Sequence, residues 1–402
     1  MASDPPSAPA RDPHPGNGRR TLLRALTGGG ALAALSLSTA PQASAAAPQA
    51  ALPAAGTGAD PFALDRFQSR GRVREYWIQA DAFTHNLVPN GKDGMTGAKY
   101  TAAQTTYQAL GFRAYTPNWG SPLAADLGPD GIGQNSGIPG PVLRAQVGDV
   151  IRVHFRNNDS HYQWPHSVHP HGVRYTPEND GGWMADDAKK PGTAVAYGET
   201  YTYTWQCAPG SVGSWPYHDH AAPQTVPHGT TASGTQSSGR EGAAHDAAAA
   251  FPGGGGGGPE MEVGAELGLF GMIAVTDEQT PQVDREFVLF LHDLSASDAP
   301  TLTQDLSLCN GAAFVDNAPT FTAKAGDRVR WRVGTLGNSL HVFHIHGHRW
   351  LTAAGWADSQ LLGPATTLTV EYQEDNPGDW LYHCHMPAHM MRGMAGRYVV
   401  SG

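Results

Sequence analysis

The chain has 402 residues and a formal net charge of −10 at pH 7, and only 15% of its residues are charged. This weakly acidic composition lacks the excess of basic residues that nucleic-acid binding requires, so we expect no nucleic-acid partner. The 50 glycines and 31 prolines exclude a helical bundle and favour short strands joined by turns. Nineteen histidines against three cysteines point toward metal binding.

The first 45 residues predict a twin-arginine signal peptide. Arg19 and Arg20 precede a mild apolar stretch, and Ala43-Ser44-Ala45 offers small residues for a signal peptidase. The apolar stretch is too short and too glycine-rich to span a bilayer, and no later segment could span one. We therefore expect export by the twin-arginine route to the cell envelope or the extracellular space. Residues 46–71 are rich in Ala and Pro and predict a flexible lead-in.

An internal repeat predicts two copies of one all-β unit. Residues 141–152 match residues 319–330, and each copy contains a Gly-Asp pair between strand-like runs. Each copy leads into a His-x-x-His-x-His-Gly block, at 166–172 and at 341–347. The boundary between the copies falls near the short polar segment 276–282. A Ser/Thr/Gly/Ala tract, about 229–262, predicts a mobile surface insertion in the first copy.

Four pairs of histidines share the spacing i, i+2. On a strand, residues two apart point to the same face, so each pair aims two imidazoles into one space. Eight imidazoles suit three copper ions, with three nitrogens for each of two coppers and two for the third. The pairs are His169 and His171, His218 and His220, His344 and His346, and His383 and His385.

The same strand parity separates a second set of metal ligands. Cys384 lies between His383 and His385, so its sulfur faces away from theirs, and His341 has an odd offset from His344. His389 and Met394 follow on a turn or loop after Pro387. One Cys, two His and a distant Met form the trigonal blue-copper set with a weak axial thioether.

Each element also has a simpler interpretation. A lone His-x-His is more often a surface or packing accident, and His-Cys-His could hold zinc. Zinc has no redox chemistry to connect that motif to eight further histidines, so the joint pattern favours copper.

The motifs His-Pro-His-Gly, Trp-Pro-Tyr-His-Asp-His, His-x-x-His-x-His-Gly-His and His-Cys-His-x3-His-x4-Met resemble the four signatures of multicopper oxidases. Length and two-fold repeat resemble the two-domain bacterial small laccases. This resemblance implies an all-β fold of two cupredoxin-like Greek-key β-sandwich domains, 72–276 and 283–402, with the blue copper in the second only. It also implies a ring-shaped homotrimer, in which one subunit's first domain meets the next subunit's second domain.

The resemblance further implies four copper ions per chain, one of type 1, one of type 2 and two of type 3. By the family's pattern, the type 2 copper takes His169 and His344. One type 3 copper takes His171, His218 and His385, and the other takes His220, His346 and His383. The blue type 1 copper takes His341, Cys384, His389 and Met394.

The predicted activity is a laccase-like oxidation. A small reducing substrate, best a phenol or aromatic amine, gives single electrons to the blue copper through solvent-facing imidazoles of His341 or His389. Cys384 relays them through His383 and His385, and dioxygen is reduced to two waters. Two alternatives stay open: a metal oxidase acting on Cu(I) or Mn(II) in copper tolerance, and a non-catalytic copper-binding or electron-carrier protein.

Four further residues carry predictions. Asp180, near Tyr175, is a candidate proton donor to reduced oxygen, although a loop Asp beside two glycines is often only a turn residue. His166 occupies the place of His341, but Asp219 stands where the blue-copper motif has Cys384, so His166 is predicted to be a packed or hydrogen-bonded remnant, not a ligand. Cys207 and Cys309 lie outside every copper motif, and we hypothesise a disulfide between them. The long segment 81–137 is expected to reshape the substrate approach.

Overall fold

The computed structural model describes residues 70–125, 135–184, 190–222 and 263–402. The predicted signal peptide, nearly all of the lead-in and the predicted insertion at 229–262 lie outside the described residues. Within the described ranges, no helix is long and apolar enough to cross a membrane.

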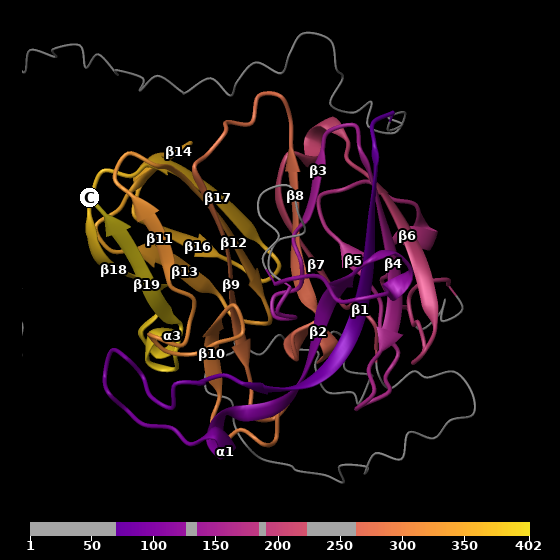
Figure 1. Cartoon of the computed structure of the whole chain (residues 1–402), viewed down its shortest axis with the longest axis horizontal. Coiled ribbons are helices and arrows are strands. Elements are labelled where there is room, and N and C mark those ends of the chain that lie inside the picture. The colour runs from indigo at the N-terminus through magenta and orange to yellow at the C-terminus, as the bar shows by residue number, and fades with distance from the viewer. Residues whose placement is uncertain (1–69, 126–134, 185–189, 223–262) are drawn as a thin grey trace, which may run out of the picture. The chain divides into compact units, whose positions relative to one another are not determined.

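Strands β1 to β8, indigo to orange in Figure 1, form two four-stranded sheets that we call the first half of the fold. One sheet has the order β2-β1-β4-β6, in which β1 pairs antiparallel with β2 and parallel with β4. The other has the order β3-β8-β7-β5. The elements are β1 (Val73–Asn86), α1 (Ala102–Thr105), β2 (Thr106–Tyr115), β3 (Leu143–Gln146), β4 (Val150–Asn158), β5 (His169–Pro170), β6 (Thr200–Gln206), β7 (Gly213–His218), α2 (Val263–Glu266) and β8 (Phe270–Thr276).

Strands β9 to β19, orange to yellow in Figure 1, form the second half. Its two main sheets have the orders β10-β9-β12-β17 and β11-β19-β18-β13-β16, and β14 and β15 make a separate hairpin. The elements are β9 (Arg285–Leu294), β10 (Leu306–Cys309), β11 (Phe321–Lys324), β12 (Arg328–Leu336), β13 (His341–Ile345), β14 (Trp350–Thr352), β15 (Gly355–Ala357), β16 (Ser359–Leu362), β17 (Thr367–Gln373), β18 (Gly378–Cys384), α3 (Pro387–Met391) and β19 (Ala395–Ser401). The described helices are all short, which confirms the all-β prediction.

The matching Gly-Asp pairs make the same turn in both halves. Gly148 and Gly326 have φ angles of 95° and 93°, a conformation that favours glycine. Each following aspartate accepts a backbone N–H three residues back, from Gln146 to Asp149 at 3.0 Å and from Lys324 to Asp327 at 2.9 Å. The sequence repeat therefore encodes one strand–turn–strand unit used twice.

The cores of the two halves are also built alike. Tyr217 on β7 is fully buried and donates to the Pro141 carbonyl at 2.7 Å, and Tyr382 on β18 donates to the Pro319 carbonyl at 2.7 Å. Burying one such aromatic side chain contributes on the order of 2–3 kcal/mol. These tyrosines tie β7 and β18, the strands that carry the histidine motifs, to the segments just before β3 and β11.

The predicted disulfide between Cys207 and Cys309 is wrong. Both cysteines are free thiols, and each is buried in a different hydrophobic core, Cys207 after β6 and Cys309 on β10. Apolar packing satisfies a thiol without a partner, and burial raises the pKa of Cys207 to about 12.

A cluster of charges joins the two halves of the chain. We call Arg144, Glu286, Arg330 and Arg332 the arginine–glutamate cluster. The Glu286 carboxylate contacts Arg144 from β3, Arg330 at 3.1 Å and Arg332 at 3.0 Å. Arg332 also donates to the Ser214 hydroxyl on β7 at 2.8 Å. Burial opposes ionisation of Glu286, but the arginines outweigh it and lower the pKa of Glu286 to about 2.

Candidate metal centres

The first histidine group consists of His169, His171, His218 and His220. Strand β5 pairs antiparallel with β7 so that His169 lies opposite His218. The ring centroid of His169 lies 5.1 Å from that of His171 and 5.0 Å from that of His220. The Nε2 atoms of His171 and His218 are 3.1 Å apart. The structure thus brings the four histidines predicted in the first half together.

The second histidine group, His344, His346, His383 and His385, repeats this geometry. His344 on β13 lies opposite His383 on β18, and the Nε2 atoms of His346 and His383 are 3.1 Å apart. The ring centroids of His344 and His385 are 5.2 Å apart. Both groups arise because two neighbouring strands each carry a histidine pair at spacing i, i+2.

Backbone carbonyls orient the imidazoles in both groups. A ring whose Nδ1–H donates to a carbonyl keeps a free lone pair on Nε2, the atom then available to a metal. The Nε2 atoms of His171 and His218, and those of His346 and His383, are 3.1 Å apart, a separation that suits adjacent ligands at about 2.0 Å from a metal. The Nδ1 partners are the carbonyls of Asp180 for His169 (2.6 Å), Asp219 for His218 (3.0 Å), Asp358 for His344 (2.7 Å) and Cys384 for His383 (2.9 Å).

Burial favours the neutral form of two imidazoles in the first group. Desolvation, followed by the neighbouring histidines, lowers the pKa of both His171 and His218 to about 4. Neutral imidazole is the form that binds a metal, so these two side chains can bind one at neutral pH without losing protons.

The third group gathers His341, Cys384 and His389, with Met394 buried beside them. The Nδ1 atoms of His341 and His389 are 3.2 Å apart, and the Cys384 sulfur lies 3.6 Å from Nδ1 of His389. The Val342 N–H donates to that sulfur at 3.3 Å. Burial raises the pKa of Cys384, so metal binding here must displace the thiol proton. One soft thiolate and two imidazoles are the donor set of a blue-copper site.

The expectation that His341 and His389 face solvent is wrong. His341 has no exposed surface and His389 is 8% exposed. Asp293 on β9 lies in front of His341, with its Oδ2 atom 3.7 Å from Nε2 of His341 and 27% of its side chain exposed. Burial alone would raise the pKa of Asp293, but His341 and hydrogen bonds from Ser307 and Ser339 lower it. The Asp293 side chain is partly exposed, but both of its carboxylate oxygens are buried against this group, and no sequence motif marked it.

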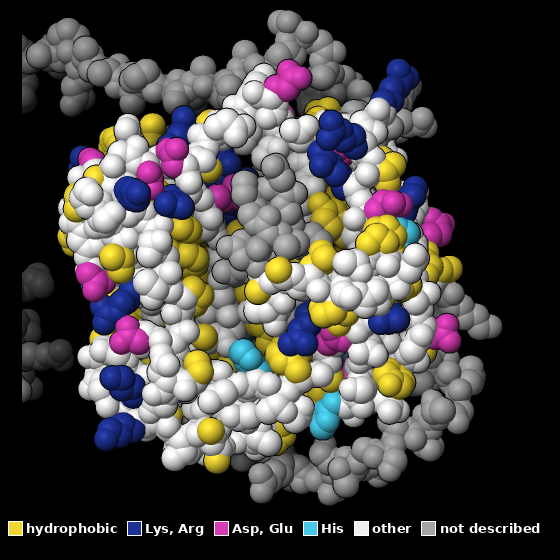
Figure 2. All heavy atoms as spheres, viewed as in Figure 1, with side chains coloured by type: hydrophobic (Ala, Val, Ile, Leu, Met, Phe, Trp, Pro, Cys, Tyr) yellow, Lys and Arg dark blue, Asp and Glu magenta, His cyan; other side chains and the backbone are white. Residues whose placement is uncertain are grey.

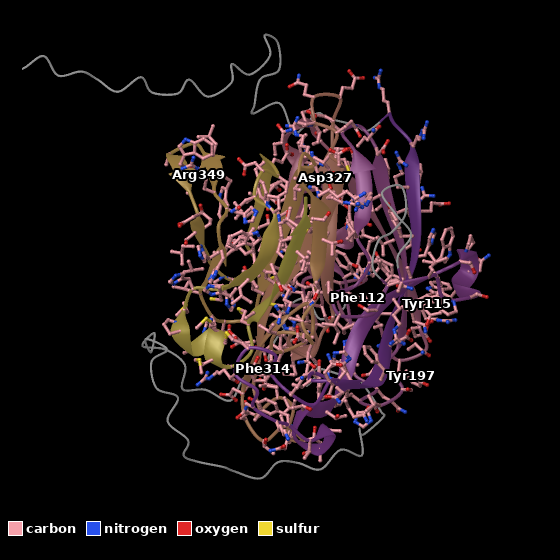
Figure 3. All side chains as sticks on the ribbon, turned by 60° about the vertical axis from the view of Figure 1, so that its left-hand side comes forward. Phe112, Tyr115, Tyr197, Phe314, Asp327 and Arg349 are labelled. Carbon is pink, nitrogen blue, oxygen red and sulfur yellow. The ribbon has the colours of Figure 1, made fainter. Side chains whose placement is uncertain are left out.

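Part of the long segment 81–137 packs beside the third group. The Ala313 N–H donates to the Leu87 carbonyl at 2.9 Å, and Phe314 donates to the carbonyl of Gly393, the residue before Met394, at 2.7 Å. The ring of Phe314, labelled in Figure 3, stacks on Tyr100 at 4.7 Å. The first half therefore contributes to the wall around the third group.

The third and second groups are joined through single residues. Cys384 belongs to the third group, and its two chain neighbours, His383 and His385, belong to the second. Because β18 alternates its side chains, the shortest covalent connection between the groups is one backbone step from Cys384. With metals bound in both groups, this connection would be a path for electrons between them.

Asp180 lies next to the first group. Its carboxylate contacts Nδ1 of His169 at 3.3 Å and Lys190 at 2.7 Å, and it is also hydrogen-bonded to Tyr175. Burial opposes ionisation, but Lys190 and His169 hold the pKa of Asp180 below its ordinary value. Sequence reasoning missed Lys190, which lies in a loop without any motif.

His166 is hydrogen-bonded, as predicted, and belongs to none of the three groups. Its Nδ1 lies 2.7 Å from Asp219 and its Nε2 lies 3.2 Å from Asp159. Burial opposes its protonation, but the two carboxylates raise the pKa of His166 to about 9.

The metal-binding side chains divide between the two halves. Among the described residues, none of the three groups combines ligands from both halves. Strand β5, with His169, and strand β16, which pairs with His344, are edge strands of their sheets. Exposed Leu351, Trp356 and Leu361 belong to β14, β15 and β16, and a surface cavity of about 860 Å³ is lined by His344 and Trp356. On the face drawn in Figure 2, described Lys and Arg side chains are interspersed with Asp and Glu.

These features define an all-β protein of two related halves with donor sets that suit copper. Two family models, both described as multicopper oxidase, match residues 124–234 and 290–402, together more than half of the chain. The chain belongs to the multicopper oxidase family, and membership implies that it binds copper.

Several curated proteins are similar to this chain. It is 29% identical to ferroxidase HEPHL1 of Mus musculus, over 84% of this chain and 29% of that protein. It is 26% identical to ceruloplasmin of Mus musculus, over 85% of this chain and 33% of that protein. It is 28% identical to a probable nitrite reductase–hydroxylamine oxidoreductase fusion protein of Kuenenia stuttgartiensis, over 77% and 32%. The chain thus spans about a third or less of these relatives.

Solved structures share the fold. A multicopper oxidase crystal structure matches with a TM-score of 0.55 and 20% identity, covering 85% of this chain and 97% of the other. A blue copper oxidase from Nitrosomonas europaea matches with a TM-score of 0.53 and 20% identity, covering 82% and 86%. This likeness confirms the cupredoxin-like β-sandwich class.

Proposed function

We propose that this protein is a laccase-like oxidase, which oxidises phenols or aromatic amines one electron at a time and reduces dioxygen to water. The observation that carries the proposal is the position of Cys384, which joins the third group to the second group through His383 and His385. Four one-electron oxidations balance one dioxygen and four protons, giving two waters. A protein that only stored copper would have no need of this connection.

The residues of the three groups fit four copper ions per chain. Copper supplies one-electron redox chemistry and a binding place for dioxygen. His341, Cys384, His389 and Met394 would hold the type 1 ion, and His169 and His344 the type 2 ion. The two type 3 ions would be held by His171, His218 and His385, and by His220, His346 and His383.

Asp293 is the residue that the reducing substrate would meet. Because His341 is fully buried, a phenol or aromatic amine cannot lie directly on its ring. Both carboxylate oxygens of Asp293 are buried, so this side chain would turn outward to accept the substrate's O–H or N–H and hold its ring near His341, whose Nε2 lies 3.7 Å from Oδ2. It can also take the proton that a phenol loses on oxidation.

Asp180 would pass protons to the oxygen-reducing site. Its carboxylate lies beside His169, and 26% of its side chain is exposed, so it can exchange protons with water. Lys190 and Tyr175 fix the orientation of the carboxylate. Because its pKa is lowered, Asp180 would transfer protons rather than store one.

The complete three-copper cluster would form between chains. In the proposed assignment each of its ions needs imidazoles from both histidine groups, yet each group draws on one half only. The first group lies by the edge strand β5 and the second by the edge strand β16. A contact of these edges between copies is heterologous, and it either closes into a ring or continues as a filament. As in the small laccases that the chain resembles, we propose a homotrimer, with the exposed Leu351, Trp356 and Leu361 in the contact.

Export by the twin-arginine route is part of the same proposal. The supporting observation is the Arg19-Arg20 motif followed by an apolar stretch and small residues. Export of a folded, copper-loaded protein agrees with free thiols at Cys207 and Cys309. A fusion of residues 1–45 to a folded reporter would test it: export must require both arginines and the twin-arginine translocase.

A metal oxidase is the second candidate. Asp293 could bind a cationic metal donor as well as a phenol, and Met391 on α3, beside the third group, is 59% exposed. Similar proteins include ferroxidases.

The experiment is a turnover comparison of a phenol, an aromatic amine, Cu(I), Mn(II) and Fe(II), with oxygen uptake recorded. The proposal expects the organic donors to give the highest kcat/KM and four donor electrons for each dioxygen. Faster turnover of a metal ion would favour the second candidate, and no oxygen uptake with any donor would leave an electron carrier.

A further inference from the structure

The backbone around the third group has a distinctive hydrogen-bond pattern. The Cys384 N–H donates to the Met394 carbonyl at 3.1 Å, and the Met394 N–H donates to the His389 carbonyl at 3.0 Å. These two bonds tie the end of β18 to the loop that carries the second imidazole and the thioether. His341, on the neighbouring strand β13, completes the set.

The first half repeats this pattern with other residues. The Asp219 N–H donates to the Leu269 carbonyl at 2.9 Å, and the Leu269 N–H donates to the Gly264 carbonyl at 2.9 Å. Asp219 therefore corresponds to Cys384, Leu269 to Met394 and Gly264 to His389. The first half therefore has a backbone position for each of the four proposed blue-copper ligands of the second half. Of the four side chains at these positions, only His166 is of the same type as its counterpart.

The rebuilt pocket leaves no room for a metal. A Cβ atom on Gly264 would lie 2.1 Å from Oδ2 of Asp219, so the carboxylate occupies the space of the missing imidazole. Oδ2 instead contacts Nδ1 of His166 at 2.7 Å, and Nε2 of that ring contacts Asp159 at 3.2 Å. We call Asp159, His166 and Asp219 the Asp–His–Asp bridge. All three are at most 1% exposed.

The bridge is connected directly to the first histidine group. Oδ1 of Asp219 accepts the N–H groups of Ser167 at 2.8 Å and Ala221 at 3.1 Å. The Ser167 hydroxyl accepts the N–H of His220 at 3.1 Å. Asp219 is itself the residue between His218 and His220, so these bonds fix the backbone on both sides of two proposed copper ligands.

We propose that the Asp–His–Asp bridge is a positioning device for the three-copper cluster, which does in the first half what bound copper does in the second. A metal held by Cys384 and His341 would tie β18 to β13. In the first half the ion pair of Asp219 and His166 ties the end of β7 to the segment before β5, and Asp159 holds the far side of the ring. None of the three bridge residues belongs to the proposed copper ligands, and the bridge would act by holding His218 and His220. The inference rests on the proposed copper assignment.

The test compares the variants Asp219→Asn and His166→Gln with the wild-type full chain. Copper per chain, the electron paramagnetic resonance (EPR) spectrum and the blue absorption are measured after copper loading. We expect both variants to lose cluster copper or magnetic coupling between the type 3 ions, while the blue absorption from the second half stays unchanged. Turnover should fall about tenfold or more.

A matched control separates positioning from stability. Asp149→Asn removes another buried carboxylate of the first half, one that accepts the N–H groups of Arg72 and Gln146 far from the motifs. It should lower the melting temperature but keep copper content and the EPR spectrum. If Asp219→Asn does not fold, Ser167→Ala keeps all three side chains of the bridge and should change the same spectrum less. It removes the hydroxyl that accepts the His220 N–H and donates to Oδ1 of Asp219 at 3.4 Å.

Full copper content with a wild-type EPR spectrum in Asp219→Asn and His166→Gln would overturn the proposal. So would the same spectral change in Asp149→Asn, or an unchanged spectrum in Ser167→Ala where the other two do not fold. Failure of the proposed function is seen separately: wild-type protein that binds cluster copper but consumes no oxygen would refute the oxidase and leave the bridge testable by its spectra.

Discussion

The two halves of this chain use one fold for two purposes. Both place a histidine group at the meeting of two strands, with the same 3.1 Å Nε2 contact and the same tyrosine hydrogen bond to a proline carbonyl. They differ in the pocket on the opposite face of these strands, where the second half has a Cys–His–His set and the first half has an Asp–His–Asp bridge. The residues on the histidine face are thus the same in both halves, whereas those on the opposite face differ. In the proposed function, electron entry would need only one blue-copper pocket, whereas the three-copper cluster would need both histidine faces.

The largest effect is expected from Cys384→Ser. Loss of the thiolate removes the defining ligand of the blue site and its link to His383 and His385, so the blue absorption should vanish and turnover fall roughly a hundredfold or more. Copper content should drop by one ion per chain, with the rest retained. Cys207→Ser is the matched control, a buried thiol in the first half that should keep colour and turnover. Persistent blue colour in Cys384→Ser would show that the ligand assignment is wrong.

The contact between the halves depends on Glu286. Glu286→Gln leaves Arg144, Arg330 and Arg332 without their shared carboxylate, and we expect a loss of about 3 kcal/mol in unfolding free energy at neutral pH. The carboxyl has a folded pKa of about 2, below its ordinary 4.5, so its contribution is present above pH 4.5 and is lost as pH falls toward 2.

Calorimetric melting of wild type and Glu286→Gln between pH 7 and pH 3 measures this. The difference between them should shrink on acidification. Glu278→Gln, an exposed residue between β8 and β9, is the control and should change little. Equal melting temperatures of Glu286→Gln and wild type at pH 7 would show that the arginine–glutamate cluster does not hold the halves together.

Asp293→Asn should produce a smaller, substrate-dependent effect. Without the carboxylate in front of His341, the KM for a phenol should rise about tenfold, while the blue absorption stays in place. Steady-state kinetics with a phenol and with a small inorganic electron donor that needs no carboxylate separate binding from electron transfer. An equal loss with both donors would mean that Asp293 acts on the blue site itself and not on the substrate.

The smallest effect is expected from reductant. Because Cys207 and Cys309 are free and lie in separate cores, a thiol reductant should leave the melting temperature of metal-free protein unchanged. Thiol titration of metal-free, denatured and unreduced protein should find three thiols per chain. A count of one would restore the disulfide that the sequence suggested.

The sequence predicts the histidine faces well because strand alternation is a local rule. Spacing alone places His169 with His171 and separates Cys384 from His383, and the matching Gly-Asp turns reveal the duplicated fold. The buried state of His341 could not be predicted in this way. It depends on Asp293, which comes from a neighbouring sheet, and the wall beside the third group includes Phe314 stacked on Tyr100 of the first half.

Two other features needed the structure for a related reason. Gly264 corresponds to His389, but 44 residues separate it from Asp219 where the second half has a four-residue spacer, so no motif connects them. The suggested disulfide relied on the exported compartment and on cysteine count. Neither observation reveals that the two cysteines lie in different hydrophobic cores. Both thiols are buried among apolar side chains, where they need no disulfide partner.

In the proposed assembly, each three-copper cluster is shared between the first half of one chain and the second half of another. Mixing two inactive variants tests this sharing most directly: His171→Ala disables the first histidine group, and His346→Ala disables the second. Each is expected to be inactive alone, whereas rings assembled from an equal mixture contain interfaces where both groups are intact. For random assembly we expect recovery of about a quarter of wild-type turnover per chain. No recovery, from mixed rings whose mass is verified by light scattering, would contradict it.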